Sequence, residues 1–459
     1  MSASPPDHRH RFHLPHPHLP HGLVSFPRRV LPWIEPWFLA YTCLGVVQGG
    51  MLPLLLPLSS ETSIEAGTII GVMNLAGLTS PLWGHLADRR RLHQHVLLAG
   101  MVVSLVALVL MPMRLGFSIQ VALAGVLGIG FAAANTVANM FIVETRPQEE
   151  WDARIGALQA LSGMGQVGGL VLAGVIGGRF SLAFGVAAAL VATAVPIAWL
   201  TLRGVHVPMP RAAAAAHPPL GGEEWAGALG RHFHIPTWRG LKRVLPKFAP
   251  SFIRLQIFWF AAFVMIGAVM SMFPLALVRV FGVAEGLPAT VYAFAAAASL
   301  MLYPREVRVA KAHGAATLMR RAFVVRSAAI ALLAAAFLTG TGPVLPLVGF
   351  IVLVVSWPAL GVSGTVLSAE LEPDEKGEAL GLFNALSSLA SAIGAFLGGC
   401  AMQLGGYPAV CVAGVVVVAI AGLWATPWSR ARSARAPDND PRQTMNLEPV
   451  RAPQEQNPV

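Results

Sequence analysis

Two asparagines lie within an otherwise apolar stretch of the sequence, where their amide groups could bind a ligand. Asn135 and Asn139 are four residues apart, so they share one face of a helix. Burying an amide in an apolar environment costs free energy unless it finds hydrogen-bond partners. Two interpretations are equally open: the amides bind a ligand that enters from water, or they bond to side chains of neighbouring helices.

Three further residues could take part in such a site. Gln48 is another amide in an apolar segment, and Trp259 and Trp357 carry indoles that could stack on a planar ligand. Ordinary aromatic packing is the alternative for both tryptophans. No pairing of a nucleophile with a base, no helical pair of metal-binding histidines and no phosphate-binding loop occurs in the sequence, so we do not expect an enzyme.

The composition indicates a membrane protein. Hydrophobic residues make up 55% of the 459 residues and charged residues only 12%, and the mean hydropathy is +0.64. These values exclude a water-soluble enzyme. The three cysteines, Cys43, Cys400 and Cys411, lie in apolar segments and predict no disulfide.

A membrane-crossing helix needs roughly 20 apolar residues. Cutting the sequence at its charges and helix breakers gives twelve such segments. Two long uncharged stretches are divided at Gly340-Thr341-Gly342-Pro343 and at Gly405-Gly406-Tyr407-Pro408, which do not easily continue a helix. The predicted spans are 37–59, 66–87, 95–113, 117–143, 154–178, 180–202, 254–278, 286–304, 322–340, 343–368, 377–403 and 406–428.

The basic residues predict which side each loop occupies. Of the 32 lysines and arginines, 29 fall on one side of this arrangement, and only Arg114, Arg179 and Arg279 fall on the other. The rule that cytoplasmic loops are positive therefore places both termini in the cytoplasm. Topology and anionic lipid account for the net charge of +10, and nucleic acid is not an expected partner.

The segments at both ends and in the middle of the sequence are predicted to lie outside the membrane-spanning helices. Residues 1–36 are predicted to be a disordered tail rich in histidine and proline, 203–253 a cytoplasmic linker and 429–459 a second disordered tail. Six histidines of the first tail could gather a transition metal, but its prolines favour an extended, solvated chain. We expect no bound metal and no cofactor.

An internal repeat divides the membrane part in two. Glu144-Thr145-Arg146-Pro147 recurs as Glu370-Leu371-Glu372-Pro373, and Gly156 recurs as Gly381. Gly165, Gly169 and Ala173 then correspond to Ala390, Gly394 and Gly398, each set being spaced by four residues. Side chains at this spacing form a smooth stripe that lets helix backbones approach closely. The predicted fold is an all-α membrane protein with two six-helix pseudo-repeats, at 37–202 and 254–428.

The turn after the second span carries a further motif, Gly84-His85-Leu86-Ala87-Asp88-Arg89-Arg90. It resembles the signature loop between helices 2 and 3 of the major facilitator superfamily, although only its front half is kept. The equivalent loop of the second half lacks the aspartate. Gly156, Gly165 and Gly169 resemble the glycine motif of the drug and proton antiporters in this superfamily, but Leu170 replaces its proline.

The resemblance implies a conformational latch. An acid is favoured near the amino terminus of another helix, and the family pattern gives Asp88 the helix that begins near Gly377, while Arg89 would pair with Glu144. With Gly84, these residues would hold the halves together in one state and separate in the other. A static anchor of basic residues is the alternative.

The resemblance also implies that helices 1, 4, 7 and 10 of the fold line a cavity, which would place Gln48, Asn135, Asn139, Trp259 and Trp357 there. With no acid at mid-depth in any predicted span, we expect a neutral or amphipathic organic cargo. The candidate acids for proton coupling are Glu35, Asp88 and Glu144, all near the cytoplasmic end.

The expected function is alternating-access transport by a monomer in the inner (cell) membrane, with efflux favoured by the glycine motif. Protons remain a candidate coupling ion. Two alternatives stay open: a metabolite importer or facilitator on the same fold, and a non-transporting assembly or sensor protein.

Overall fold

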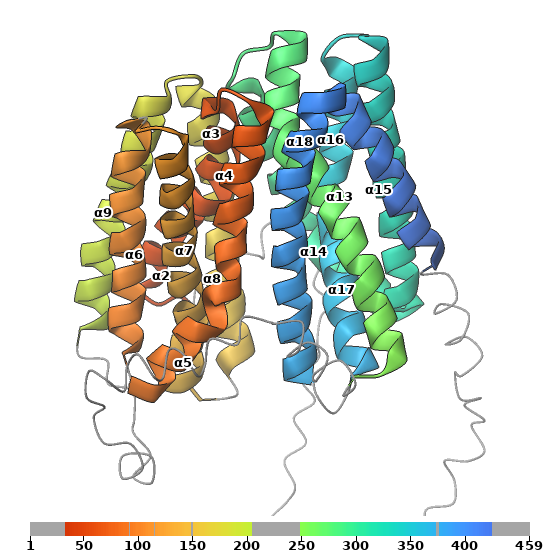
Figure 1. The fold of residues 1–459 in the computed structure, drawn as a ribbon. Coiled ribbons are helices and arrows are strands. Elements are labelled where there is room, and N and C mark those ends of the chain that lie inside the picture. The colour runs from red at the N-terminus through yellow and green to blue at the C-terminus, as the bar shows by residue number, and fades with distance from the viewer. Residues whose placement is uncertain are drawn as a thin grey trace, which may run out of the picture. The chain divides into compact units, whose positions relative to one another are not determined.

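The computed structural model describes residues 33–90, 92–113, 115–147, 150–203, 248–372 and 376–424. Every regular element in these ranges is a helix (Figure 1). In a bilayer the helix satisfies all of its backbone hydrogen bonds within one segment, and the apolar composition demands such a structure. The protein is therefore all-α, as the sequence predicted. The predicted linker and both predicted tails lie almost wholly outside the described residues.

The chain divides into two compact units. The first contains the residues up to Ser59 and those from Leu75 to Phe233, and the second contains Ser60–Asn74 and everything from His234 onward. A short segment from the first half of the sequence thus folds with the second unit. The predicted domain boundaries assigned it to the first bundle.

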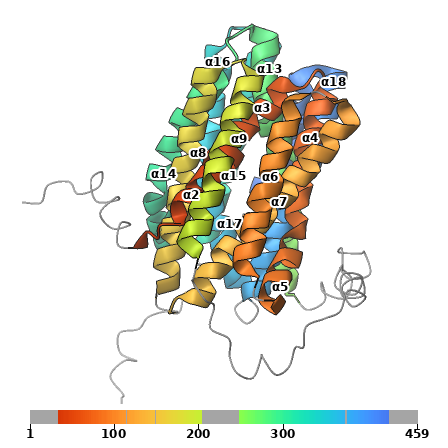
Figure 2. The same cartoon turned by 90° about the vertical axis from the view of Figure 1, so that its left-hand side faces the viewer.

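The first unit consists of helices that pack side by side. The helix α6 contacts both α7 and α9 (Figure 2). The elements are α2 (Phe38–Gly45), the π-helix η2 (Val46–Met51), α3 (Leu52–Ser59), the 3-10 helix η3 (Ala76–Thr79), α5 (Ser80–Arg90), α6 (His93–Leu110), the 3-10 helix η4 (Met111–Met113), α7 (Phe117–Thr145), α8 (Trp151–Ile176) and α9 (Phe180–Leu202).

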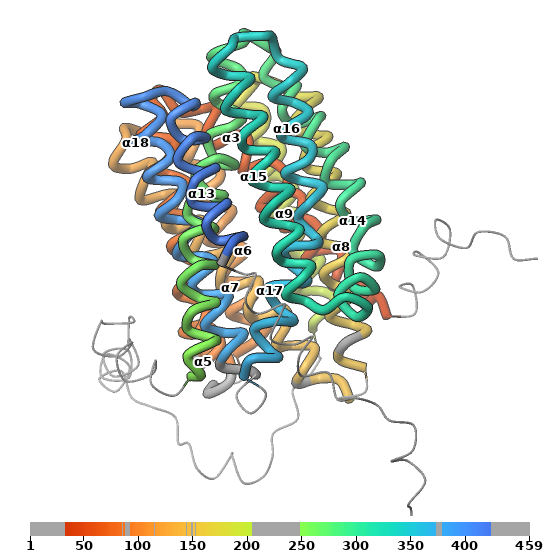
Figure 3. The backbone as a smooth tube through the Cα atoms, turned by 90° about the vertical axis from the view of Figure 1, so that its right-hand side faces the viewer, coloured from red at the N-terminus to blue at the C-terminus, as the bar shows by residue number. Residues whose placement is uncertain are grey.

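The second unit is built around the long helix α18, which contacts α13, α15 and α17, while α15 lies beside α16 and α17 (Figure 3). Its elements are α4 (Ser63–Leu75, all but the last residue), α13 (Pro250–Phe281), α14 (Leu287–His313), α15 (Ala315–Thr339), α16 (Val344–Val355), α17 (Trp357–Leu371) and α18 (Lys376–Trp424).

The long uncharged stretches turn where the sequence predicted. Helix α15 ends at Gly340, which adopts the left-handed conformation with φ of 61°. The run assigned to α18 is interrupted at Gly406, whose φ of 71° and ψ of 175° are not helical. A residue with a Cβ is strained at such angles, which is why glycine stands at both turns.

Ten helices of the described chain are long and apolar enough to cross a membrane. The last of them, Ala379–Leu423, contains the turn at Gly406 and so includes two of the predicted spans. The predicted second span is not among the ten, because the chain forms α4, η3 and α5 there instead of one helix. The twelve crossings and the pseudo-repeat stay predictions.

Glycines bring specific helices into close contact in each unit. In the first unit a Cβ added to Gly165 would lie 2.5 Å from the carbonyl oxygen of Thr42, and one added to Gly169 would overlap the carbonyl oxygen of Val46. In the second unit a Cβ at Gly398 would lie 2.8 Å from Cα of Ala268, and one at Gly394 would overlap the carbonyl oxygen of Val264. Gly156 has no such neighbour. The glycine stripes therefore face α2 and η2 in one unit and α13 in the other.

The same kind of packing attaches α4 to α18. A Cβ at Gly399 would overlap the carbonyl oxygen of Ser63, and Gly67 has Cα of Gly399 within 3.0 Å of its own Cβ position. The Ser63 hydroxyl donates to Oε1 of Gln403 at 2.9 Å. Close backbone contact and a polar bond together hold α4 in the second unit.

Candidate functional site

Amide side chains form a connected cluster in the first unit. Nδ2 of Asn135 donates to Oε1 of Gln48 at 2.8 Å. Nδ2 of Asn139 donates to the backbone carbonyl of Asn135 at 2.8 Å, and Nε2 of Gln159 donates to Oδ1 of Asn139 at 3.2 Å. Gln48, Asn135 and Asn139 are half-buried and Gln159 is exposed. The structure thus brings together the three amides that the sequence singled out, and it adds Gln159.

The local backbone explains how Gln48 reaches this cluster. It lies in η2, a π-helical turn within the first predicted span, and such turns re-aim side chains and are frequent at functional sites. Gly49 and Gly50, which follow it, pack directly on Gln166 and Gly169 of α8. Helix α8 therefore supports the turn that carries Gln48.

The cluster retains unused hydrogen-bonding capacity. The bond between these two amides uses Oε1 of Gln48 and Nδ2 of Asn135. Within the described chain the other two amide atoms, Nε2 of Gln48 and Oδ1 of Asn135, make no hydrogen bond. One free donor and one free acceptor are thus held on adjacent side chains. This pair complements a neutral group that itself both accepts and donates.

A charged cluster lies where the first unit begins. The Oε1 atom of Glu35 accepts hydrogen bonds from Nε of Arg146 at 2.9 Å and from Nη1 of Arg154 at 2.8 Å. Its Oε2 atom accepts one from the indole of Trp37 at 3.0 Å. Arg154 also pairs with Glu150. One carboxylate thus joins the residues preceding α2, the end of α7 and the start of α8.

This geometry changes the interpretation of Glu35. The sequence placed it in the tail that ends at residue 36, yet its side chain is only 10% exposed. The hydrogen bond from Arg146 to the carboxylate raises the pKa of Arg146, because the charged guanidinium is the form that Glu35 stabilises. Glu35 is therefore a structural ion-pair centre in this conformation.

The second unit contains a buried cation, Arg326. The predicted ninth span begins at residue 322 and so contains Arg326 near its first residue, whereas α15 begins at Ala315 and places Arg326 in its middle. Its side chain is fully buried. Nη2 donates to the backbone carbonyl of Leu353 at 3.0 Å, whereas Nε and Nη1 have no hydrogen-bond partner in the described chain.

The carbonyl that Arg326 binds lies at a break between two helices. Helix α16 ends at Val355, and α17 begins at Trp357 with Pro358 in its first turn. Proline removes a backbone donor, so carbonyls of the preceding turn need other partners. The Ser356 hydroxyl joins Arg326 on the Leu353 carbonyl, at 2.9 Å. Arg326 thus caps the carboxyl end of α16, where a positive charge is favoured.

The two predicted tryptophans have different environments. Trp259 is 2% exposed, stacks on Phe263 with centroids 4.4 Å apart, and donates its N–H to the Ser387 hydroxyl at 2.8 Å. It is core packing in this conformation. Trp357 is 38% exposed, and its ring lies 5.1 Å from the guanidinium carbon of Arg326. Trp357 can therefore contact a ligand, while Arg326 lies behind it.

The predicted latch is not tested by these contacts. The side chains of Asp88, Arg89 and Glu144 lie outside the described part of the structure. Gly84, on α5, is described and packs against Met140 and Thr136 of α7. The latch stays a prediction.

The fold and these sites can be compared with known proteins. The family model of the Major Facilitator Superfamily matches residues 37–369. The chain belongs to the Major Facilitator Superfamily. This membership makes it a transporter and not an enzyme, as the sequence predicted. A search of curated proteins finds no match.

Solved transporters share the fold at low sequence identity. A variant of the nucleoside transporter NupG is 14% identical, with a TM-score of 0.66 over 87% of this chain and 99% of that one. A variant of the peptide transporter POT, solved with sulfate, is 16% identical, with a TM-score of 0.65 over 88% and 98%. The inward-open xylose transporter XylE from E. coli is 13% identical, with a TM-score of 0.55 over 86% and 95%. At these identities the likeness concerns the fold alone.

Sequence reasoning missed two elements of this superfamily member. A basic residue within the apolar run of the ninth predicted span was a usable signal for Arg326. The contacts of Glu35 gave no signal, because its arginine partners are more than 100 positions away in the sequence.

Replacing Glu35 with glutamine should destabilise the protein by about 1–3 kcal/mol, because two guanidinium groups lose the anion that they share. The midpoint of thermal unfolding of the purified protein measures this loss. Glu150→Gln is the matched control, since among the described residues Glu150 forms one ion pair, with Arg154, and is more exposed than Glu35. An equal loss in both variants would contradict the central role of Glu35.

Replacing Arg326 with methionine should leave the thermal midpoint unchanged or raise it, because a buried charge without an anion is costly. Transport should nevertheless fall at least tenfold, since the break between α16 and α17 loses its cap. Counterflow of a bound cargo and the thermal midpoint are measured on the same preparation. A stability loss with a normal transport rate would show that Arg326 serves only the fold.

Proposed function

We propose that this transporter exports a small neutral or amphipathic organic molecule by alternating access, and that the amide cluster of the first unit binds the cargo. The observation that carries the proposal is the free donor on Gln48 beside the free acceptor on Asn135. A neutral group such as an amide or hydroxyl satisfies both atoms, whereas a carboxylate only accepts and an ammonium only donates.

Charge is consistent with this cargo class. The charged cluster at Glu35 is internally paired, and Arg326 is fully buried behind Trp357. Arg146 of this cluster is exposed, but its charge is already paired with Glu35, and the charge of Arg326 is buried. A molecule with a polar neutral group fits the amides of the first unit without an ionic partner.

The direction of transport rests on a motif. The stripe of Gly165 and Gly169, which resembles the antiporter motif, packs on α2 and η2 next to Gln48 and favours efflux. Uptake is the second candidate, because one structural relative is a D-xylose–proton symporter and others transport nucleosides or peptides. Initial rates in right-side-out and inside-out vesicles, each at two pH values, distinguish the two and detect proton coupling.

The proposal also covers the number and arrangement of the membrane crossings. We propose twelve crossings in two pseudo-repeats, with α4, η3 and α5 forming the second crossing and the turn at Gly406 separating the last two. The transporter would function as a monomer in the inner membrane with both termini in the cytoplasm. A non-transporting sensor on the same fold would bind ligand without exchanging it, so counterflow separates that alternative.

Replacing Asn135 with alanine should weaken cargo binding about tenfold, because it removes the acceptor and leaves Gln48 without its partner. Ligands are first found by a thermal-shift screen of neutral organic molecules, and affinity is then measured by titration. Thr136→Val is the matched control: the Thr136 hydroxyl bonds only to the backbone of its own helix, at Ala132. Equal affinity in both variants would rule out the amide cluster as the cargo site.

The latch makes a separate prediction. Replacing Asp88 with asparagine should abolish transport while membrane insertion stays normal, because the amide cannot provide the negative charge that the latch requires. The initial rate of transport and the amount of inserted protein are the two measurements. An unchanged rate would leave Asp88 as a topology anchor only.

A further inference from the structure

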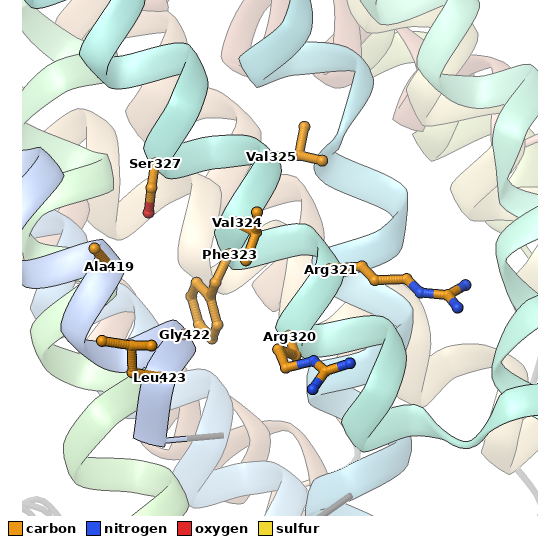
Figure 4. Close-up of a pocket in the computed structure, with 9 residues that line it drawn as sticks. All are labelled: Arg320, Arg321, Phe323, Val324, Val325, Ser327, Ala419, Gly422 and Leu423. Carbon is orange, nitrogen blue, oxygen red and sulfur yellow. The ribbon is translucent and has the colours of Figure 1, made fainter. Parts of the chain in front are cut away.

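A cleft separates part of α15 from the last helical segment of α18 on the surface of the second unit (Figure 4). Its volume is about 690 Å³. The two helices touch where Gly422 packs against Phe323 and Gly414 packs against Ile330. Most of the lining is apolar, and the residues that form it are Phe323, Val324, Val325, Ser327, Ala419, Gly422 and Leu423, with Arg320 and Arg321.

Three apolar side chains of the cleft are exposed, whereas Phe323 is buried. Val324 is 60% exposed, Val325 43% and Leu423 72%. A contiguous exposed apolar surface of this kind marks a binding or membrane-facing region. Because α15 is one of the helices able to cross a membrane, hydrocarbon chains are the natural neighbours of this surface.

One end of the cleft is positively charged. Arg320 and Arg321 precede the apolar part by less than one helical turn, and within the described chain neither makes a hydrogen bond or an ion pair. The adjoining end of α14 adds Lys311 and His313. Figure 4 shows Arg320 and Arg321 on the part of α15 farther from Ser327, with the Arg321 side chain extending away from Ala419 and Leu423. No anion of the described chain pairs with these two arginines, so they are available to an external one.

A polar atom lies deeper in the cleft. The Ser327 hydroxyl oxygen is buried and has no hydrogen-bond partner in the described chain. It is seven residues after Arg320, which corresponds to about 10 Å along the helix. The surface thus presents cations at one end, a hydroxyl farther along and an apolar channel throughout.

We propose that this cleft binds one anionic phospholipid. The phosphate contacts Arg320 and Arg321, an acyl chain lies along Val324, Ala419 and Leu423, and the Ser327 hydroxyl donates to a polar oxygen of the lipid backbone. A soluble anion would use only the arginines. A zwitterionic lipid would be attracted to them less strongly, because its phosphate is balanced by its own ammonium. The joint arrangement fits a molecule that carries both parts, and basic residues near a membrane surface attract anionic lipid. This site is independent of the proposed cargo.

Native mass spectrometry of the full-length protein in detergent tests the proposal. The probes are phosphatidylglycerol and phosphatidylcholine with identical acyl chains, and inorganic phosphate. The wild-type protein should retain phosphatidylglycerol in preference to phosphatidylcholine. Arg320→Gln and Arg321→Gln should each weaken phosphatidylglycerol binding about fivefold. Arg305→Gln is the matched control, because Arg305 is exposed on α14 and does not line the cleft.

Two further comparisons decide whether the cleft itself is occupied. Ala419→Phe fills the channel without changing any charge, so it should also reduce phosphatidylglycerol binding. If Arg305→Gln weakens binding as much as Arg320→Gln, the attraction is diffuse and the proposal fails. It also fails if inorganic phosphate displaces the lipid, which would indicate a free-anion site, or if Ala419→Phe binds lipid normally. Retained folding of each variant is checked by its thermal midpoint.

Discussion

The low polarity of the bilayer is the constraint on which this structure depends. Inside it, an unpaired polar group costs several kcal/mol, so backbone groups are satisfied within helices and side-chain groups must find one another. The amides of Gln48, Asn135 and Asn139 obey this constraint by bonding in sequence across η2 and α7. Hydrophobic attraction between helices is weak in such a medium, and close contact at glycines takes its place.

The two units satisfy the constraint in different ways. The first contains a network of neutral amides and a group of ions that neutralise one another around Glu35. The second contains the buried Arg326, which has one carbonyl, one indole face and no carboxylate within the described chain. A neutral network can exchange partners at little cost, whereas an uncompensated cation fixes the helix end that it caps. We therefore expect the amide hydrogen bonds of the first unit to rearrange more easily than the contacts of Arg326 in the second unit.

Much of the fold could be predicted because composition and helix breakers act locally. Gly340 and Gly406 end helices through their own backbone angles, so they were visible in the sequence. The bounds of α15 were not, because Arg320 and Arg321 were taken as loop residues although a helix readily contains them. The grouping of amides followed from spacing on one helix, but Gln159 and the partners of Glu35 depend on contacts between distant segments. Such contacts carry no local signal.

The attachment of α4 to α18 has a consequence for how the protein is made. Ser63 and Gln403 are 340 positions apart, so α4 leaves the ribosome long before its partner exists. During that time Gly67 and the exposed backbone around it have only lipid or the translocation machinery for contact. The segment is also interrupted by η3 and is not among the strongly apolar helices. During synthesis, α4 therefore stays without its contacts to α18 until the last part of the chain has been made.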